Sequence, residues 1–286
     1  MRRYAKTVAY WITNLAEKLG GQPLSGINHK LNRYLLAEAH TELAGNRAAG
    51  IDGETKQEFD KYLTARVEEL AERIHGDSWR APAVRRVEIP KGDGKTRPLG
   101  IPTYEDKVLQ KAFVMLVGPV FEREFHPGSY GYRPGRSVHH AVKAVDAALY
   151  SGHHWVVELD IKGYFDSIPH TLLQQMFRRR VSDGVLNRLV LGWLKAGVMK
   201  DGIWQATEDG TPQGGIVSPM LANLYLNDVL DQWFEHAVQP RLKSTARLIR
   251  YADDAVLCFK DETDARRVFR VMRKRFEKFG LTLPPE

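Results

Sequence analysis

Apolar positions recur every three or four residues along most of the chain, and in a few short stretches they alternate instead. The helical spacing predicts helices over residues 4–19, 28–45, 54–74, 104–125, 137–150, 169–180, 186–195, 220–233 and 261–279. Alternating or short apolar runs predict strands over residues 84–89, 96–101, 155–161, 248–251 and 255–259. No internal repeat or low-complexity segment interrupts this order, so one interleaved α+β fold is expected rather than a string of modules.

Composition narrows the class of protein only a little. The 286 residues, 43% of them hydrophobic, suffice for one large or two smaller domains with a buried core. The net charge of +7 suits a polyanionic partner, but it also suits many ordinary proteins. Because Cys258 is the only cysteine, an internal disulfide and a cysteine-rich zinc site are excluded, and a cytoplasmic location is expected. No apolar run reaches the ~18 residues of a membrane span, so no membrane association is expected.

Three carboxylates follow or interrupt apolar strands. Asp253 and Asp254 lie between the two apolar arms of a hairpin predicted over residues 248–259, and Asp160 lies near the end of an earlier strand. Charges at the end of a buried hairpin repel each other, and a bound cation would offset that repulsion. If the two strand ends are neighbours in one sheet, Asp160 and Asp253 can bind divalent ions about 3.5 to 4 Å apart, an arrangement used for in-line phosphoryl transfer. A solvated Asp-Asp turn is the alternative.

Three segments of the chain resemble the core motifs of reverse transcriptases, and they occur in the same order. They are DIKGYFD at 160–166, TPQGGIVSP at 211–219 and YADD at 251–254. Three further segments are similar to those of group II intron-encoded enzymes in particular: AGIDG at 49–53, KTRPLGIP at 95–102 and SYGYRPGRS at 129–137. The resemblance covers roughly residues 30 to 286 and is specific, because it rests on an ordered set rather than on a lone motif.

The resemblance implies a right-hand polymerase with fingers and palm, in which an antiparallel palm sheet packs on helices. The fingers, with an N-terminal helical extension, are expected over 1–104, and the palm over 105–286 with interleaved fingers segments at about 170–212. The chain is expected to end before the thumb, because it stops shortly after the basic segment 261–279 and a glycine-containing turn.

The same resemblance assigns roles to individual residues. Asp160 and Asp253 are expected to be catalytic metal ligands, with the backbone carbonyl of Ile161 adding an oxygen and Asp254 supporting the site less directly. Phe165 falls where a bulky ring clashes with a ribose 2′-hydroxyl and so selects deoxynucleotides, although a core aromatic is the alternative. The expected dNTP-binding residues are Lys91, Arg97, Gly163, Tyr164, Phe165 and Gln213.

The residues expected to contact template or primer are Pro98, Leu99, Arg133, Arg136, Gly214 and Gly215. Each basic or glycine-rich segment also has a simpler explanation. Lys91 and Arg97 could clamp the β- and γ-phosphates or belong to a solvated basic hairpin. The glycines at 214–215 could let the nucleotide approach the backbone or form a plain turn. The segment with Arg133 and Arg136 could bind the nucleic-acid backbone or only pack against the palm.

The implied function is an RNA-directed DNA polymerase that extends a primer, encoded by a group II intron and used in retrotransposition. Its implied cofactor is Mg²⁺, bound as two ions, for which Mn²⁺ can substitute. Its implied partners are an RNA template, a DNA or RNA primer, dNTPs and, for an intron-encoded enzyme, the cognate intron RNA. Two alternatives stay open: an RNA-binding intron maturase or splicing cofactor with reduced polymerase activity, and a domesticated CRISPR- or defence-associated reverse transcriptase. An RNA-making polymerase is disfavoured by Phe165, which stands where such an enzyme has a small residue. The sequence leaves the oligomeric state open.

Overall fold

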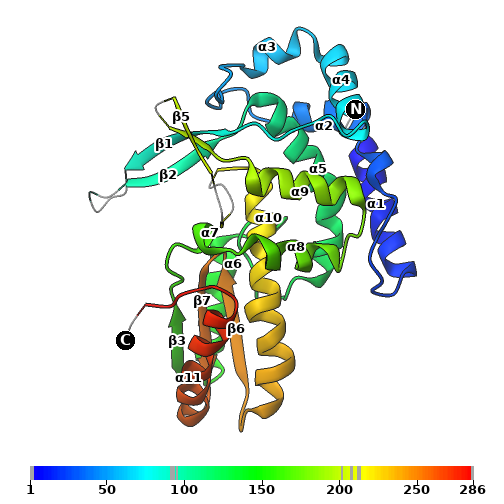
Figure 1. Ribbon diagram of the computed structural model, residues 1–286. Helices are drawn as coiled ribbons and strands as arrows, with labels where there is room; N and C mark the ends of the chain where they lie inside the picture. Colours follow the sequence, from blue (N-terminus) through cyan, green and yellow to red (C-terminus); the bar gives the residue numbers. More distant parts are fainter. Residues whose placement is uncertain are drawn as a thin grey trace. The chain divides into compact units, whose positions relative to one another are not determined.

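The chain forms two compact units, each built from two separate stretches of sequence (Figure 1). The computed structural model describes residues 3–90, 94, 96–200, 202–206, 209–210 and 214–284. The first unit contains Met1–Arg123 and Gln174–Ser218, and the second contains Glu124–Leu173 and Pro219–Glu286. Both units combine helices with a small, mainly antiparallel sheet, so the predicted mixture of helices and strands in an interleaved order is confirmed.

Helices make up most of the first unit. They are α1 (Arg3–Lys18), α2 (Arg33–Glu42), α3 (Lys56–Asp60), α4 (Leu63–His75), α5 (Tyr104–Glu124) and α9 (Gly184–Lys195), while α8 (His170–Arg178) crosses from one unit to the other. Phe113 of α5 is fully buried, and its ring lies 5.9 Å from that of Phe177 and 4.9 Å from that of Trp193. Helix α5 therefore contributes the centre of this unit's core.

Two predicted helices are shorter or broken, and local hydrogen bonds explain both differences. Asn32 is extended, and its side chain accepts from the N–H groups of Tyr34 and Leu35, so α2 begins at Arg33. The first residues of the helix predicted over 28–45 form the 3₁₀ turn η1 (Asn28–Lys30) instead. The helix predicted over 54–74 is two helices, because a capping box at Thr55 starts α3 and the chain leaves helical geometry before α4.

The sheet of the first unit has the strand order β2-β1-β4-β5. The predicted hairpin is present as β1 (Val84–Pro90) and β2 (Thr96–Ile101), which pair antiparallel from Arg85 opposite Ile101. A second hairpin, β4 (Val198–Lys200) and β5 (Ile203–Gln205), pairs in parallel with β1 and was not predicted. Strands of three residues are too short to show the alternation by which strands are recognised in a sequence.

The second unit is built on an antiparallel sheet of order β3-β7-β6, from β3 (Trp155–Leu159), β7 (Asp254–Phe259) and β6 (Ala246–Tyr251). Helix α6 (Val138–Tyr150) packs against β6 and β7, where Ala141 and Ala148 meet Ile249 and Cys258. Helix α11 (Glu262–Lys278) packs against β3 and β7. The helix predicted over 261–279 and the predicted strands are thus confirmed, with β3 ending two residues early.

A long helical segment precedes the β6–β7 hairpin and changes its geometry along its length. Helix α10 (Ser218–Leu226) continues into the π-helical segments η2 (Asn227–Asp231) and η3 (Phe234–Val238), followed by the 3₁₀ turn η4 (Gln239–Arg241). Asn227, Val229, Leu230 and Asp231 of η2 are all buried. π-Helical segments are rare and occur often at functional sites, and the apolar pattern did not predict them. No helix in the described part of the chain is long and apolar enough to cross a membrane.

Candidate active site

The β6–β7 hairpin carries two of the three predicted acids at its turn. Tyr251 pairs with Asp254, which leaves Ala252 and Asp253 as the turn itself. Ala252 has a φ of 60°, a left-handed conformation that is uncommon for a residue other than glycine. Its side chain is buried, Asp253 is half-buried and Asp254 is exposed. The prediction of a hairpin with acids at its tip is therefore confirmed.

The third acid lies at the same end of the sheet. Strands β3 and β7 lie side by side (Figure 1). Leu159, the last residue of β3, pairs with Ala255, so Asp160 follows β3 beside the start of β7. Burial raises the pKa of the Asp253 carboxyl, and the negative charges of Asp254 and Asp160 raise it further, while a backbone hydrogen bond and the charge of Arg250 oppose the rise. Two segments of the second unit, the β6–β7 hairpin and the residues after β3, thus bring three carboxylates within electrostatic reach of one another.

This group of acids has the chemistry of an open site for a hard cation. In the residues that the structure describes, no three His, Cys, Asp or Glu side chains converge closely enough to hold a metal ion by themselves. Mg²⁺, however, is usually bound by one or two carboxylates together with water and substrate phosphate oxygens rather than by a closed protein cage. The raised pKa of Asp253 reflects burial and mutual repulsion that such a cation would relieve. The carboxylates present therefore fit a divalent ion whose remaining ligands come from the substrate.

The segment after Asp160 is held by a buried tyrosine. Ile161 is buried, Gly163 has a φ of 57°, and the short helix α7 (Tyr164–Ser167) follows. The Tyr164 hydroxyl donates to the carbonyl of Ala222 at 2.5 Å, and its side chain is only 3% exposed. Phe165, in contrast, is half-buried. Tyr164 therefore anchors the segment through its side chain, while the Phe165 side chain keeps part of its surface exposed.

The loop between α5 and α6 buttresses the hairpin. The N–H of Tyr130 donates to the carbonyl of Arg250 at 2.7 Å, and the N–H of Arg250 donates to the carbonyl of Gly128 at 2.8 Å. A Cβ on Gly131 would lie 2.2 Å from the backbone nitrogen of Ala252, far inside any real contact. Glycine is therefore required at position 131, because the loop backbone approaches the Ala252 turn so closely.

The two arginines of this loop bond mainly to the loop itself. Arg133 is only 8% exposed and donates to the carbonyls of His126 and Ser129, and it lies over the ring of Phe125. Arg136 donates to the carbonyls of Pro127 and Ser129. These bonds favour the structural explanation of both side chains, and a contact of either residue with template or primer stays a prediction.

The remaining predicted site residues belong to the first unit. Lys91 and Gln213 lie outside the described residues. On β2, Arg97, Pro98 and Leu99 pair through their backbones with Ile89, Glu88 and Val87, respectively. Gly214 has a φ of 105°, and a Cβ there would lie 2.5 Å from the carbonyl oxygen of Gly100 and 2.7 Å from a methyl carbon of Leu99. Gly215, next to it, is buried. The structure thus brings Leu99 and Gly214 together, beside a cavity of about 510 Å³ that both residues line with Arg47 and Lys107.

A buried polar chain supports the segment that contains Gly214. The carboxylate of Asp106 accepts from Trp193 Nε1 at 2.7 Å and from Gln110 Nε2 at 2.8 Å. The Gln110 Oε1 in turn accepts from the N–H of Val217 at 3.1 Å. None of these residues was among the predicted site residues, although Asp106 and Gln110 are polar positions four residues apart inside an apolar helix, which was a usable signal.

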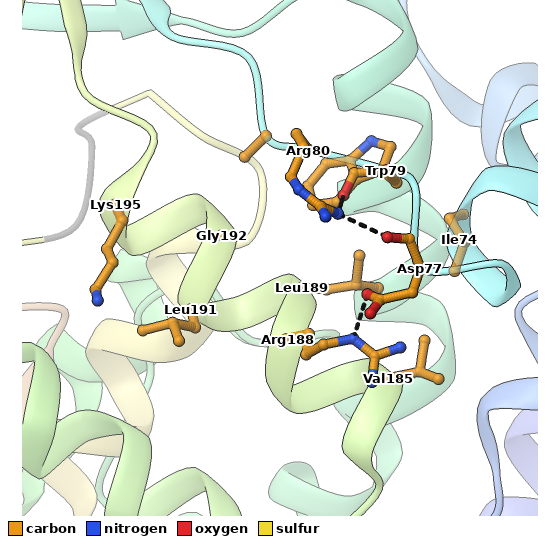
Figure 2. Close-up of a pocket in the computed structure, with 11 residues that line it drawn as sticks. Ile74, Asp77, Trp79, Arg80, Val185, Arg188, Leu189, Leu191, Gly192 and Lys195 are labelled. Atoms are coloured by element: carbon orange, nitrogen blue, oxygen red, sulfur yellow. Dashed lines mark hydrogen bonds and ion pairs between the residues drawn. The ribbon is translucent and has the colours of Figure 1, made fainter.

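A second pocket of the first unit contains none of the predicted site residues. Its volume is about 310 Å³, and α4, α9 and the segment that follows α4 line it. Figure 2 shows that its charged groups are largely engaged, since Arg188 pairs with Asp77 at 2.8 Å and Arg80 donates to the Asp77 carbonyl. This pocket therefore offers no catalytic constellation.

Comparison with known proteins agrees with this geometry. The chain is 36% identical over 245 residues to Protein YkfC of Escherichia coli (strain K12), a match that covers 76% of this chain and 64% of that protein. It is 35% identical over 206 residues to the group II intron-encoded protein LtrA of Lactococcus lactis subsp. cremoris, covering 70% of this chain and 34% of LtrA. The chain thus spans less than two thirds of the length of either relative.

Structural and family comparisons point the same way. A solved structure named "Partial Cas6-RT-Cas1--Cas2 complex" matches with a TM-score of 0.51 at 21% identity, covering 89% of this chain and 42% of that chain, which shows similarity of fold. Residues 89–286 match the family described as "Reverse transcriptase (RNA-dependent DNA polymerase)". This match spans more than half of the chain and includes all three acids at the end of the β3-β7-β6 sheet. The chain belongs to the reverse transcriptase family.

Proposed function

We propose that this chain is the fingers and palm of an RNA-directed DNA polymerase, which extends a primer with dNTPs on an RNA template. One observation carries the proposal: Asp160, Asp253 and Asp254 come together at one end of an antiparallel sheet in a chain of the reverse transcriptase family. Acids in this arrangement suit phosphoryl transfer, because catalysis there depends mainly on positioning and on neutralising charge.

In this proposal the first unit is the fingers and the second unit is the palm. The sequence suggested a boundary near residue 104, whereas the compact units assign most of α5 to the first unit. We propose the compact units as the working domains, because Phe113 of α5 packs on Phe177 and Trp193 of the same unit.

The proposed chemistry assigns a task to each residue of the second unit. Asp160 and Asp253 would hold two Mg²⁺ ions with the carbonyl of Ile161, and Asp254 would support them from its exposed position at the start of β7. When bound, the ions would lower the pKa of the primer 3′-hydroxyl and neutralise charge on the leaving pyrophosphate, and Mn²⁺ could substitute. The protein's own contribution is to hold the carboxylates at one sheet end, where the pairing of β3, β7 and β6 places the backbone of all three acids.

Selection of the sugar is assigned to Phe165. Phe165 directly follows Tyr164, whose side chain is held by its hydrogen bond to Ala222. The Phe165 side chain is half-buried, so part of its surface remains exposed. A rigid ring beneath the sugar would clash with a ribose 2′-hydroxyl and admit deoxyribose. Because the Tyr164 side chain is buried, any nucleotide contact of Gly163 and Tyr164 would be made by their backbone.

Nucleotide and template contacts are assigned to the first unit and to the α5–α6 loop. We propose that Lys91, Arg97 and Gln213 contact the incoming dNTP. Pro98, Leu99, Gly214 and Gly215 would contact the template, since Gly214 packs against Leu99 and Gly100 beside a cavity lined by basic side chains. We also propose that Arg133 and Arg136 contribute to the template–primer groove.

We further propose a group II intron origin, with retrotransposition as the biological role and a cytoplasmic site of action. The similarity to LtrA, whose name describes a group II intron-encoded protein, supports this origin. An intron maturase that binds its cognate RNA, or a CRISPR- or defence-associated enzyme, is the alternative. Retention of all three acids favours an active polymerase over a splicing cofactor that has lost its catalytic site.

Primer extension on an annealed RNA template tests the proposal. The wild-type protein should extend a labelled primer with dNTPs and Mg²⁺, and it should incorporate NTPs far less well. Asp253→Asn is the control for the active site and should abolish extension. Phe165→Ala should increase incorporation of NTPs relative to dNTPs. Equal use of NTPs and dNTPs by the wild-type protein would refute a DNA polymerase, and unchanged discrimination in Phe165→Ala would refute the role of the ring.

A further inference from the structure

Arg250 is a fully buried charged side chain next to the catalytic turn. It precedes the YADD segment on β6, its exposed fraction is 0%, and it is the largest completely buried side chain among the described residues. Arginine is almost never buried in this way unless its charge and its donors are paired. The hydrogen-bond partners of Arg250 therefore show which segments of the fold this side chain holds together.

The guanidinium group of Arg250 joins three parts of the second unit. Nε and one terminal nitrogen donate to the two carboxylate oxygens of Asp231, at 2.9 Å and 2.6 Å. The other terminal nitrogen donates to Oδ1 of Asn223 at 2.9 Å and to the carbonyl oxygen of Ala252 at 2.8 Å. Asp231 is also fully buried and belongs to the π-helical segment η2, while Asn223 belongs to α10. One side chain thus connects this helical segment with the turn that carries Asp253.

The turn requires such support because its backbone is strained. Ala252 holds a φ of 60°, which costs a residue with a Cβ about 1–2 kcal/mol relative to ordinary geometry. The Arg250 bond to the Ala252 carbonyl fixes one side of this residue. On the other side lies Gly131, whose carbonyl accepts from the Asn223 amide at 2.8 Å. Asn223 therefore links the arginine to the loop that packs against the turn.

We propose that Arg250, with Asp231 and Asn223, forms a positioning network that fixes the Ala252 turn and thereby sets the place of the Asp253 carboxylate relative to Asp160. This inference rests on the proposed function, because it assumes that Asp253 acts as a metal ligand. The network touches neither substrate nor metal. Its effect on catalysis comes through the backbone of Ala252, in the way that partners behind metal ligands orient those ligands.

A purely structural ion pair is the competing explanation. Buried ion pairs can often be replaced by apolar residues without loss of stability, so stability alone does not explain this one. A merely structural Arg–Asp pair also needs no bond to the catalytic turn. Here one of the two terminal nitrogens of Arg250 donates to the Ala252 carbonyl and to Asn223, and Asn223 in turn donates to the Gly131 carbonyl. That division of donors favours positioning of the turn.

Two variants separate the charge of Arg250 from its geometry. Arg250→Lys keeps a positive charge beside Asp231, but a single ammonium group cannot reach the acceptors that the planar fork spans. Asn223→Ala leaves the Arg250–Asp231 pair and the Arg250 bond to Ala252 intact, and it removes the two bonds of the Asn223 amide, to Arg250 and to Gly131. Met272→Ala is the matched control, because Met272 is fully buried on α11 of the same unit and contributes no described partner of Arg250.

Two measurements are made on each folded variant: primer extension with dNTPs and Mg²⁺, and binding of Mn²⁺ followed by the electron paramagnetic resonance signal of the free ion. Thermal unfolding is recorded so that variants are compared at equal folded fraction. Arg250→Lys should lower kcat and weaken Mn²⁺ binding by about 10- to 100-fold, with KM for dNTP little changed. Asn223→Ala should show the same pattern to a smaller degree. Met272→Ala should lower the unfolding temperature and leave both readouts unchanged.

The outcomes distinguish this inference from the proposed function. If the wild-type protein extends primers and Arg250→Lys behaves like Met272→Ala, the positioning network is refuted while the polymerase assignment stands. If the wild-type protein does not extend primers, the proposed function fails, and Mn²⁺ binding decides the present inference. Binding that depends on Asp253 and weakens in Arg250→Lys supports it. If Mn²⁺ binding is absent, or is equal in the wild-type protein and Arg250→Lys, the positioning network is refuted.

Discussion

Asp106 offers a test of how a buried carboxylate affects both stability and the segment that contains Gly214. Burial raises the pKa of Asp106 to about 6, against hydrogen bonds from Trp193 and Gln110 that lower it. The negative charge of Glu105 adds to the rise and the positive charge of Lys107 opposes it. Since the ordinary value is 3.8, the difference of about 2 pKa units corresponds to about 3 kcal/mol.

The sign of the pH dependence follows from proton binding. Between about pH 4 and pH 6 the folded protein binds the Asp106 proton more tightly than the unfolded chain does. Ionisation of Asp106 therefore lowers the free energy of unfolding progressively as the pH rises through this window. Above about pH 6 the full cost of about 3 kcal/mol is present, and below about pH 4 it is absent.

Asp106→Asn removes the charge but also disturbs the hydrogen-bond chain. The new amide oxygen can still accept from Trp193, but the new amide nitrogen faces the Gln110 Nε2, which is also a donor. Rotating the Gln110 amide would satisfy this contact and leave the Val217 N–H facing a donor instead. One buried hydrogen bond is lost in either case, which costs about 1–3 kcal/mol at all pH values.

The two effects combine into a result that depends on pH. Relative to the wild-type protein, Asp106→Asn should be less stable by about 1–3 kcal/mol at pH 3.5, where the ionisation cost is absent, and between equally stable and about 2 kcal/mol more stable at pH 7.5, where the wild-type protein bears the full cost of about 3 kcal/mol. Urea unfolding midpoints across this range measure the difference. Asp146→Asn, at an exposed position of α6, is the control for loss of a surface carboxylate and should follow the wild-type profile. Parallel pH profiles of Asp106→Asn and the wild-type protein would refute the reasoning.

Three further substitutions test the second unit, each by urea unfolding. Gly131→Ala should destabilise by about 3 kcal/mol or more, because its Cβ would collide with Ala252, whereas Gly118→Ala, with no atom nearer than 3.9 Å, should be tolerated. Ala252→Gly should raise stability by up to about 1 kcal/mol, since relief of the left-handed strain exceeds the added freedom of the unfolded chain, and a loss of stability would contradict this. Tyr164→Phe should cost about 1 kcal/mol by removing the bond to Ala222 and leave kcat unchanged; a fall in kcat without loss of stability would assign the hydroxyl to the nucleotide.

The sequence predicted the elements whose signals are local. The β6–β7 hairpin was predictable because its apolar arms flank two acids, and α11 because its amphipathic pattern is long. The β4–β5 hairpin was missed because its strands are too short for a pattern, and η2 because a π-helical turn keeps the apolar composition of a helix. Local signals therefore predicted the strands that end at the three acids more reliably than the segments that join them.

Sequence signals also found individual residues only where the signal was local. The acids were found because carboxylates stand out against apolar strands, and the family resemblance supplied their order. The link between Arg250 and Asp231 left no sequence signal, because a strand residue and a π-helical residue nineteen positions away share no periodicity. Asp106 and Gln110 were overlooked although both interrupt the buried face of α5, which shows that polar residues inside an apolar helix should be searched for partners.

Both units hold a functional segment by a polar side chain that is buried at a cost. In the first unit Gln110 binds the backbone of Val217 and depends on the carboxylate of Asp106. In the second unit Arg250 binds the backbone of Ala252 and depends on the carboxylate of Asp231. Apolar residues at these positions could give an equally stable or more stable fold, because burying charge is expensive. They could not accept or donate hydrogen bonds to a turn whose backbone has left regular geometry. The charges are therefore better explained by the need to hold two irregular segments in one conformation than by the stability of the chain.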